Sequence, residues 1–302
     1  MNHLNIMNKG VDPALDYELY EPAEEENERN KRLILEIYRD VKRVCDENKL
    51  CIMLAGGSCL GAIRHHGYIP WDDDMDCVMP RADYEEFKRI FEKNLGDKYL
   101  IEAPGIAGGV ANNLFMKVIL KDGPQKLEPE KIKAPGARGL WLDIVPMEYA
   151  DDNVFKRILK GLACDALAYL VISNYLFRYR NSLARQISCA SVKGAVKYYL
   201  RMALGAPLCF MSQSDWYALY DRFSRGKAPT KTVTFPAGIR HYLGEAHPID
   251  VFLPPSQGEF EGETVRLPAK AHVYLRALYG ADYMTPIPAK SRHLWAKRKG
   301  ES

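Results

Sequence analysis

The segment from Leu54 to Pro80 constrains the fold most, because a short apolar run ends there in Gly56-Gly57-Ser58 and a second apolar run follows an aspartate-rich stretch. Residues 51–55 predict a short buried strand. The glycines allow the backbone to turn and to approach a phosphate closely. A helix that starts at this turn would offer unpaired N–H groups to phosphate oxygens. Ser58 is expected to cap that helix or to donate its hydroxyl to a phosphate.

Two carboxylates precede the second apolar run, at Asp74 and Asp76. Side chains two positions apart in a strand share a face, so both should project together while Met75 faces the other way. Like charges this close are costly unless a cation lies between them. Magnesium prefers a few carboxylates together with substrate phosphate oxygens, so the pair predicts a Mg²⁺ site, with Mn²⁺ as an alternative ion. Asp72 and Asp73 fit a solvated turn, which is the competing interpretation of the whole run.

Three more charged residues are candidates for the same site. Asp143 is the one charge in the apolar segment 139–146, where an unpaired buried carboxylate would be expensive. It is therefore expected to meet a metal or a hydrogen-bond donor, or to act in catalysis. Lys117, inside the apolar run 114–120, and Arg64, in the helix after Ser58, are expected to neutralise phosphate charge. A structural role remains the alternative for Asp143 and for Lys117.

The rest of the chain alternates between helix-like and strand-like patterns. Apolar residues at helical spacing predict helices over 31–45, 82–94 and 270–279, and apolar runs predict strands over 51–55, 114–120 and 140–145. This order predicts an α+β fold, with a mixed β-sheet flanked by helices. We expect a polar extension over 1–30, a catalytic core over 31–151, a basic helical insertion over 152–230, and a C-terminal part over 231–302 that completes the catalytic domain.

Composition excludes several classes of protein. A formal net charge of +3 is too small to argue for nucleic-acid binding, and seven cysteines without a C-x-x-C pair argue against a disulfide framework and a zinc clip. Residues 156–201 hold nine basic residues and one acidic residue, Asp165. Lys160 and Asp165 interrupt the apolar run 158–177, so a buried or interfacial helix is expected there rather than a membrane span. The basic residues are a solvated helix face or a surface for an anionic membrane or polymer.

The residues around the aspartates are similar to the LicD family of phosphocholine transferases, a branch of the nucleotidyltransferase superfamily. Fukutin-related ribitol-phosphate transferases are its animal relatives. The resemblance rests on three blocks, at 56–64, 67–76 and 79–84, and it covers residues 31–147. A weaker similarity follows in three short pieces, at 260–262, 267–268 and 278–284.

The resemblance implies a nucleotidyltransferase fold and a metal-dependent phosphotransferase. Gly56, Gly57 and Ser58 resemble the phosphate-holding turn of the superfamily. Asp74 and Asp76 match its paired metal ligands, and Asp143 resembles the third acidic residue, so these three are the candidate catalytic and metal-binding residues. The candidate residues for substrate binding are Gly56, Gly57, Ser58, Arg64, Trp71 and Lys117.

The resemblance also implies the partners of the enzyme. The donor would be a CDP-alcohol such as CDP-choline, and the acceptor a sugar hydroxyl of a cell-surface polysaccharide, teichoic acid or glycolipid. The protein would be cytoplasmic, at the inner face of the cell membrane and in peripheral contact with it, with no nucleic acid as partner. A choline headgroup favours an aromatic cage, for which Tyr68, Trp71 and Trp141 are near in the sequence.

Two other functions stay open at this point. The same fold also transfers the nucleotide itself to a small molecule, a protein or an RNA end. A protein with a degenerate site would instead be a non-catalytic nucleotide-binding scaffold, against which the presence of all three aspartates argues. The identity of the transferred phospho-alcohol and of the general base is left open by the sequence.

Overall fold

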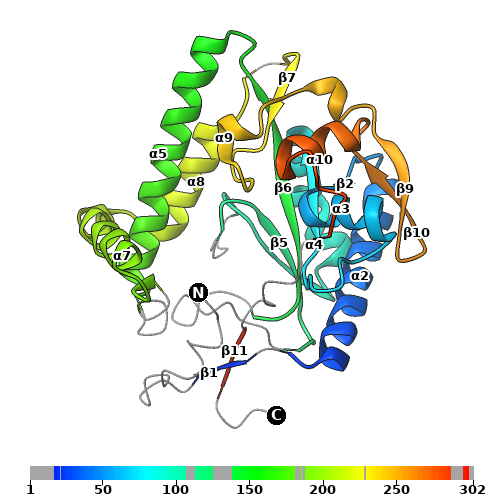
Figure 1. Cartoon of the computed structure of the whole chain (residues 1–302), viewed down its shortest axis with the longest axis horizontal. Coiled ribbons are helices and arrows are strands. Elements are labelled where there is room, and N and C mark those ends of the chain that lie inside the picture. Colours follow the sequence, from blue (N-terminus) through cyan, green and yellow to red (C-terminus); the bar gives the residue numbers. More distant parts are fainter. Residues whose placement is uncertain are drawn as a thin grey trace.

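The computed structural model describes residues 22–106, 113–124, 138–180, 185, 188–227 and 229–286, together with the backbone alone of two paired strands, β1 (Tyr17–Tyr20) and β11 (Trp295–Arg298). The predicted α+β fold is confirmed: a mixed sheet is flanked by helices, and further helices stand beside it (Figure 1). All seven cysteines are free, and Cys209 is the one that is exposed.

The central sheet places the predicted strands next to one another. Its order is β2 (Met53–Leu54), β3 (Asp76–Pro80), β6 (Trp141–Ala150), β5 (Met116–Leu120) and β4 (Tyr99–Glu102). Strands β3 and β6 run parallel, and the other neighbours in this order are antiparallel. Strand β6 continues beyond the predicted end at residue 145 because its second half pairs with β7 (Thr232–Thr234), which pairs in turn with β8 (His247–Pro248).

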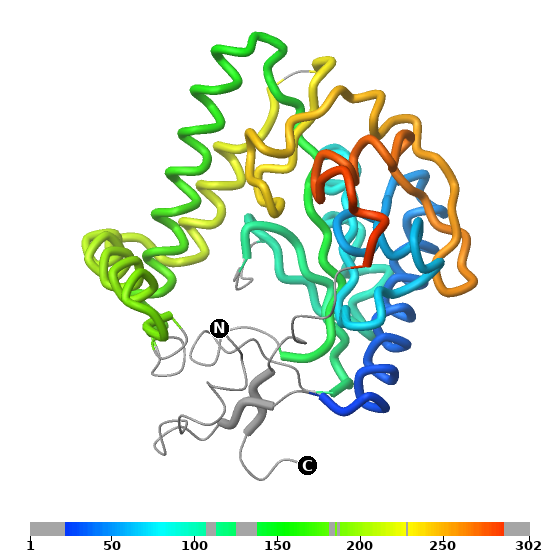
Figure 2. The backbone as a smooth tube through the Cα atoms, viewed as in Figure 1, coloured from blue at the N-terminus to red at the C-terminus, as the bar shows by residue number. Residues whose placement is uncertain are grey.

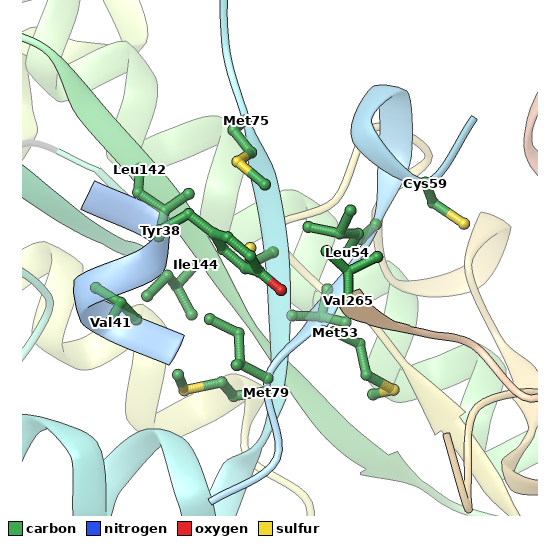
Figure 3. Packing of buried hydrophobic residues seen from close by; sticks show 14 of the residues in the cluster. Tyr38, Val41, Met53, Leu54, Cys59, Met75, Met79, Leu142, Ile144 and Val265 are labelled. Carbon is green, nitrogen blue, oxygen red and sulfur yellow. The ribbon is translucent and has the colours of Figure 1, made fainter. Parts of the chain in front are cut away.

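Helices α2 (Glu24–Glu47) and α4 (Arg81–Leu95) pack against the sheet. Figure 3 shows Tyr38 and Val41 of α2 among buried residues of the strands, including Ile144 and Met79. Helix α2 starts at Glu24 rather than at residue 31, so the last part of the predicted extension is helical. Three glutamates occupy its first turn, where negative charge favours the helix dipole.

The C-terminal part of the chain returns to the N-terminal half (Figure 2). Strands β9 (Ser256–Phe260) and β10 (Glu263–Leu267) form a hairpin that contacts β2 and helix α3 (Gly56–His65). Helix α10 (Ala271–Tyr279) matches the helix predicted over 270–279. It packs on α3 and on η3 (Ile249–Val251). Residues far apart in the sequence therefore meet at the start of α3.

The middle of the chain forms a group of helices with a small core of its own. It consists of α5 (Val154–Arg178), α7 (Val192–Gly205), η2 (Ala206–Phe210) and α8 (Gln213–Ser224), and α9 (His241–Gly244) also contacts α5. Part of the predicted basic face fastens these helices together: Arg178 donates to the carbonyl oxygen of Cys209, and Lys160 to that of Arg225. In the part of the chain that the structure describes, none of the helices has the length and apolarity to cross a membrane. The predicted division of the chain into four parts stays a prediction.

Candidate active site

The site begins at the turn between β2 and α3. Gly56 has φ = +51°, in the left-handed region that favours glycine. A Cβ atom at this position would lie 2.8 Å from Oδ2 of Asp76. The backbone N–H of Gly56 donates to the hydroxyl of Tyr274 on α10, at 3.0 Å. Gly56 is therefore required both for the turn and for the close approach of the backbone to Asp76.

Ser58 does not cap the helix that follows this turn. The N-cap residue is Ala55, so Ser58 already lies within the first turn of α3. Its Oγ accepts a hydrogen bond from the backbone N–H of Asp76, at 2.8 Å, and the N–H of Ala55 donates to the carbonyl oxygen of Asp76, at 3.0 Å. Ser58 thus holds the start of α3 against the start of β3, and the expected capping role was wrong.

A row of charged residues crosses the sheet beside this turn. Asp76 on β3 is in register with Asp143 on β6, Asp143 with Lys117 on β5, and Lys117 with Glu102 on β4. Register partners on neighbouring strands project from the same face of the sheet. Asp143, Lys117 and Glu102 are buried, and Asp76 is half-buried. The structure therefore brings three predicted site residues together and adds Glu102 to them.

Lys117 occupies the centre of this row. Its Nζ lies 3.4 Å from Oδ1 of Asp143 and 3.7 Å from the ring centre of Trp141. The lysine thus contacts two residues of β6, the negative charge of Asp143 and the face of the aromatic ring of Trp141. In this structure its charge compensates Asp143, as the structural alternative for Lys117 expects, and a role toward a substrate phosphate stays a prediction.

Negative charge is concentrated at Asp76. Burial raises the pKa of its carboxyl group well above the ordinary value, and the charges of Asp74, Asp143 and Asp72 raise it further, against a smaller opposite effect of Lys117. Asp74 precedes β3 rather than lying in it, yet Asp74 and Asp76 are both half-buried while Met75 between them is buried. The expected alternation of the two carboxylates is thus present.

This charge distribution suits a divalent cation. Among the described residues, no group of three His, Cys, Asp or Glu side chains is arranged as a ready metal site. Magnesium, however, is usually held by one or two carboxylates and completes its shell with water and substrate phosphate oxygens. A raised pKa at Asp76, caused in part by other carboxylates, is the expected result of placing such oxygens together without the cation. Asp74 and Asp76 fit this incomplete type of site.

A pocket of about 460 Å³ borders the start of α3. It is lined by three predicted substrate-binding residues: Gly57, Arg64 and Trp71. Arg64 also donates to the carbonyl oxygen of Tyr283, at 2.8 Å. A smaller pocket of about 130 Å³ is lined by Gly56 and Asp76. Two pockets therefore border the start of α3, and neither of these two is lined by Ser58, Asp74, Lys117 or Asp143.

The proposed aromatic cage is not assembled as expected. Tyr68 packs edge-to-face on Phe260, with ring centres 4.8 Å apart, and Trp141 lies under Lys117. Of the three, Trp71 lines the larger pocket, while Tyr68 is turned toward the β9–β10 hairpin and Trp141 lies on β6. The other aromatic residues of this pocket are Tyr279 and Tyr283.

Besides Glu102, four residues of the site were not predicted from the sequence as site residues. Asp72 lies against the turn, since a Cβ atom at Gly57 would be 2.8 Å from its Oδ2. Burial raises the pKa of Tyr279, and the charges of Asp76, Asp72 and Asp74 raise it further. Asp282 and Tyr283 complete the pocket on this side. The signal that existed was the similarity at 278–284, which carried no role for its residues.

Comparison with known proteins identifies the part of the chain that carries this site. Residues 49–126 match the model of the LicD/FKTN/FKRP nucleotidyltransferase domain. The lipopolysaccharide cholinephosphotransferase LicD of Haemophilus influenzae is 41% identical over 59 residues, which is 20% of this chain and 22% of that protein. An uncharacterised protein of Rickettsia typhi is 31% identical over 72 residues, 23% of each chain. The matches thus span less than a quarter of these relatives. Residues 49–126 are thus similar to a LicD-family nucleotidyltransferase domain, as the motifs predicted, and Asp143 lies outside the matched segment.

Proposed function

We propose that this chain, with its segment similar to a LicD-family nucleotidyltransferase domain, transfers a phospho-alcohol group, phosphocholine, from a CDP-activated donor to a sugar hydroxyl. The observation that carries the proposal is the juxtaposition of Asp74 and Asp76 with the Gly56 turn inside the matched segment. The name of the Haemophilus influenzae relative supports phosphocholine as the group and a surface glycan as the acceptor. The acceptor class extends to other cell-surface polysaccharides, to teichoic acids and to glycolipids, assembled at the cytoplasmic face of the membrane.

Each group of residues at the site has its own role in the proposed reaction. The N–H groups of Gly57 and Ser58, in the first turn of α3, face the donor phosphates, where helix N–H groups lack partners within the helix. Asp74 and Asp76 hold Mg²⁺. When bound, the ion supplies charge neutralisation for the phosphate oxygens. Asp143 accepts the proton of the acceptor hydroxyl or completes the ion's ligands.

The transfer is an in-line displacement. The acceptor oxygen forms a bond to the distal phosphorus, the bond from that phosphorus to the CMP oxygen breaks, and CMP leaves with the electron pair. The pocket lined by Arg64 and Trp71 receives the donor, and Arg64 offers positive charge to it. Catalysis here consists mainly of positioning and electrostatic stabilisation, so the carboxylates are the most sensitive part of the site.

Calorimetric titration tests the proposal. CDP-choline, CDP-ribitol, CDP-glycerol and CTP are each titrated with and without Mg²⁺ into the wild-type protein and into Asp74→Ala/Asp76→Ala. We expect magnesium-dependent binding of CDP-choline that the double variant loses. The matched control is Asp97→Ala/Asp250→Ala, which removes two exposed carboxylates and should bind as the wild type does.

The outcomes separate the candidate functions. Release of free CMP together with a phosphocholine-bearing acceptor supports the proposal. A nucleotidylated acceptor would mean nucleotidyl transfer, and preference for another CDP-alcohol would change the transferred group. Tight nucleotide binding without magnesium-dependent turnover would mean a scaffold. Absence of binding for all four compounds would refute the catalytic assignment.

The glycine of the turn gives a second test. Gly56→Ala would place a methyl group 2.8 Å from Oδ2 of Asp76, so we expect the carboxylate to be displaced and magnesium-dependent donor binding to weaken at least about tenfold. The protein should still fold, because a side-chain atom can move aside. Gly105→Ala is the matched control: its φ of +77° is equally unfavourable, but nothing lies within 4 Å of the added atom. Equal donor affinity in the two variants would contradict the role of Gly56.

A further inference from the structure

Helix α7 carries a row of large apolar side chains on the face that it turns away from the protein. Their exposed fractions are 84% for Val192, 65% for Val196, 58% for Tyr199, 53% for Leu200 and 37% for Leu204. These positions recur at intervals of three and four residues, so they form one stripe along the helix. Soluble proteins rarely leave a contiguous apolar stripe of this kind without a partner.

The opposite face of α7 is fixed firmly to α5, so the orientation of the stripe is determined. A Cβ atom at Gly205 would lie 2.2 Å from the carbonyl oxygen of Ser173, which shows how closely the two helices approach. Asn174 donates from Nδ2 to the carbonyl oxygen of Gly205, at 3.1 Å. The guanidinium of Arg201 lies 4.9 Å from the ring centre of Tyr169. The helix cannot rotate to bury its stripe without breaking these contacts.

Basic side chains lie along the border of the stripe. Lys193 and Lys197 are exposed, and no acidic residue occurs between Val192 and Gly205. An apolar stripe bordered by lysines is the pattern of a helix that lies in the plane of a membrane interface. We propose that the outer face of α7 docks on an anionic lipid surface, with Val196 and Leu200 among the lipids and the two lysines at the headgroups.

The placement of basic side chains favours α7 as the docking face over the other exposed apolar surface of the same helical group. The first half of α5 also exposes apolar side chains, including Phe155 and Leu159. There, however, Arg157 and Lys160 donate to backbone carbonyl oxygens, which leaves Lys156 as the one exposed basic side chain of that half, against Lys193 and Lys197 on α7. The lysines of α7 also oppose pairing of this face with a second copy of itself, which would bring like charges together.

Flotation of the full chain with lipid vesicles tests the proposal. We expect the protein to float with vesicles of phosphatidylcholine mixed with phosphatidylglycerol, and to float less at high salt or with phosphatidylcholine alone. Val196→Ser/Leu200→Ser should lower the partition coefficient at least about tenfold, because both inserted side chains are lost. Lys193→Gln/Lys197→Gln should lower it about 25-fold on the anionic vesicles, roughly fivefold per lysine, and leave binding to phosphatidylcholine unchanged.

The control pair is Phe155→Ser/Leu159→Ser, which removes at least as much exposed apolar surface from α5 and should float as the wild type does. Every substitution is at an exposed position, so the melting temperatures should stay unchanged. The proposal is overturned if the α7 variants float normally, or if only the α5 pair loses binding. It is also overturned if the wild type stays in solution, or forms a dimer that Val196→Ser/Leu200→Ser dissociates. No substrate is involved, so these results are independent of the proposed transfer reaction.

Discussion

Asp76→Asn is expected to abolish transfer and at the same time to make the metal-free protein more stable. The substitution removes a carboxylate from the site where negative charge is most concentrated, and with it a ligand for the cation on which the proposed reaction depends. The rate should fall roughly a thousandfold or more. Without metal, the neutral amide avoids burial of the charge and repulsion from Asp74 and Asp143. The melting temperature in the presence of a chelator should therefore rise by at least ~2 °C.

The pH dependence follows from the same raised pKa. Asp76 has a higher pKa in the folded protein than in the unfolded chain, so the folded state binds more protons between the two values. Stability of the metal-free wild type should therefore fall as pH rises through the raised pKa. Asp76→Asn should lack this contribution. Magnesium should stabilise the wild type selectively, and less so at low pH, where protons compete with the ion.

Thermal melts across a pH series, with chelator and with Mg²⁺, measure both effects, and a transfer assay measures the rate. Asp250→Asn is the matched control, since it makes the same chemical change at an exposed carboxylate, 62% accessible and paired with Lys270. It should alter neither rate nor pH dependence. An Asp76→Asn variant that keeps its activity, or that melts below the metal-free wild type at neutral pH, would contradict the assignment of Asp76.

Arg81→Met is expected to destabilise the whole protein strongly. Arg81, at the start of α4, lies within 2.6 Å of Oε1 of Glu148 on β6 and 3.0 Å from Oδ1 of Asp221 on α8. Both carboxylates are almost completely buried, and their charges raise the pKa of Arg81 against the effect of burial. Removing the arginine would leave Glu148 buried without its ionic partner, whereas Asp221 keeps Arg225, 2.6 Å from its Oδ2. The expected cost is about 3–5 kcal/mol.

Chemical denaturation gives the free energy of unfolding for this comparison. Arg89→Met is the control on the same helix: Arg89 is 71% exposed and pairs with Glu86, so its loss should change the free energy of unfolding little. Adding Glu148→Gln to Arg81→Met should recover part of the loss, because one unpaired charge is removed. Equal stability of the Arg81 and Arg89 variants would show that the buried cluster does not tie the helical group to the sheet.

Much of the local structure could be predicted because it depends on neighbours in the sequence. Helical spacing located α4 and α10 within one residue at each end, and the apolar run 114–120 contained β5. Element ends were less certain, because they depend on partners elsewhere in the chain. Strand β6 extends to Ala150 through its pairing with β7, and no pattern in its own sequence indicates that partner.

For the site, too, local features could be predicted, whereas contacts between distant segments could not. The alternation of Asp74, Met75 and Asp76 and the glycines of the turn are local features, and they indicated the carboxylates and the phosphate-holding backbone. The capping role predicted for Ser58 was wrong because its partner, the N–H of Asp76, becomes close only when α3 folds back beside β3. Tyr279 was missed because an aromatic residue at a helix end has no functional signal until α10 packs on α3.

The sequence by itself therefore determined which residues share a face within each strand or helix, and which of them are the candidates for phosphate and metal binding. Only the tertiary structure decided which faces meet. The register that aligns Asp76, Asp143, Lys117 and Glu102 arises from pairing between strands far apart in the chain. The outward apolar stripe of α7 depends likewise on its close packing against α5. The physical reason is that periodicity is a property of one segment, whereas pairing and burial depend on the free energy of the whole chain.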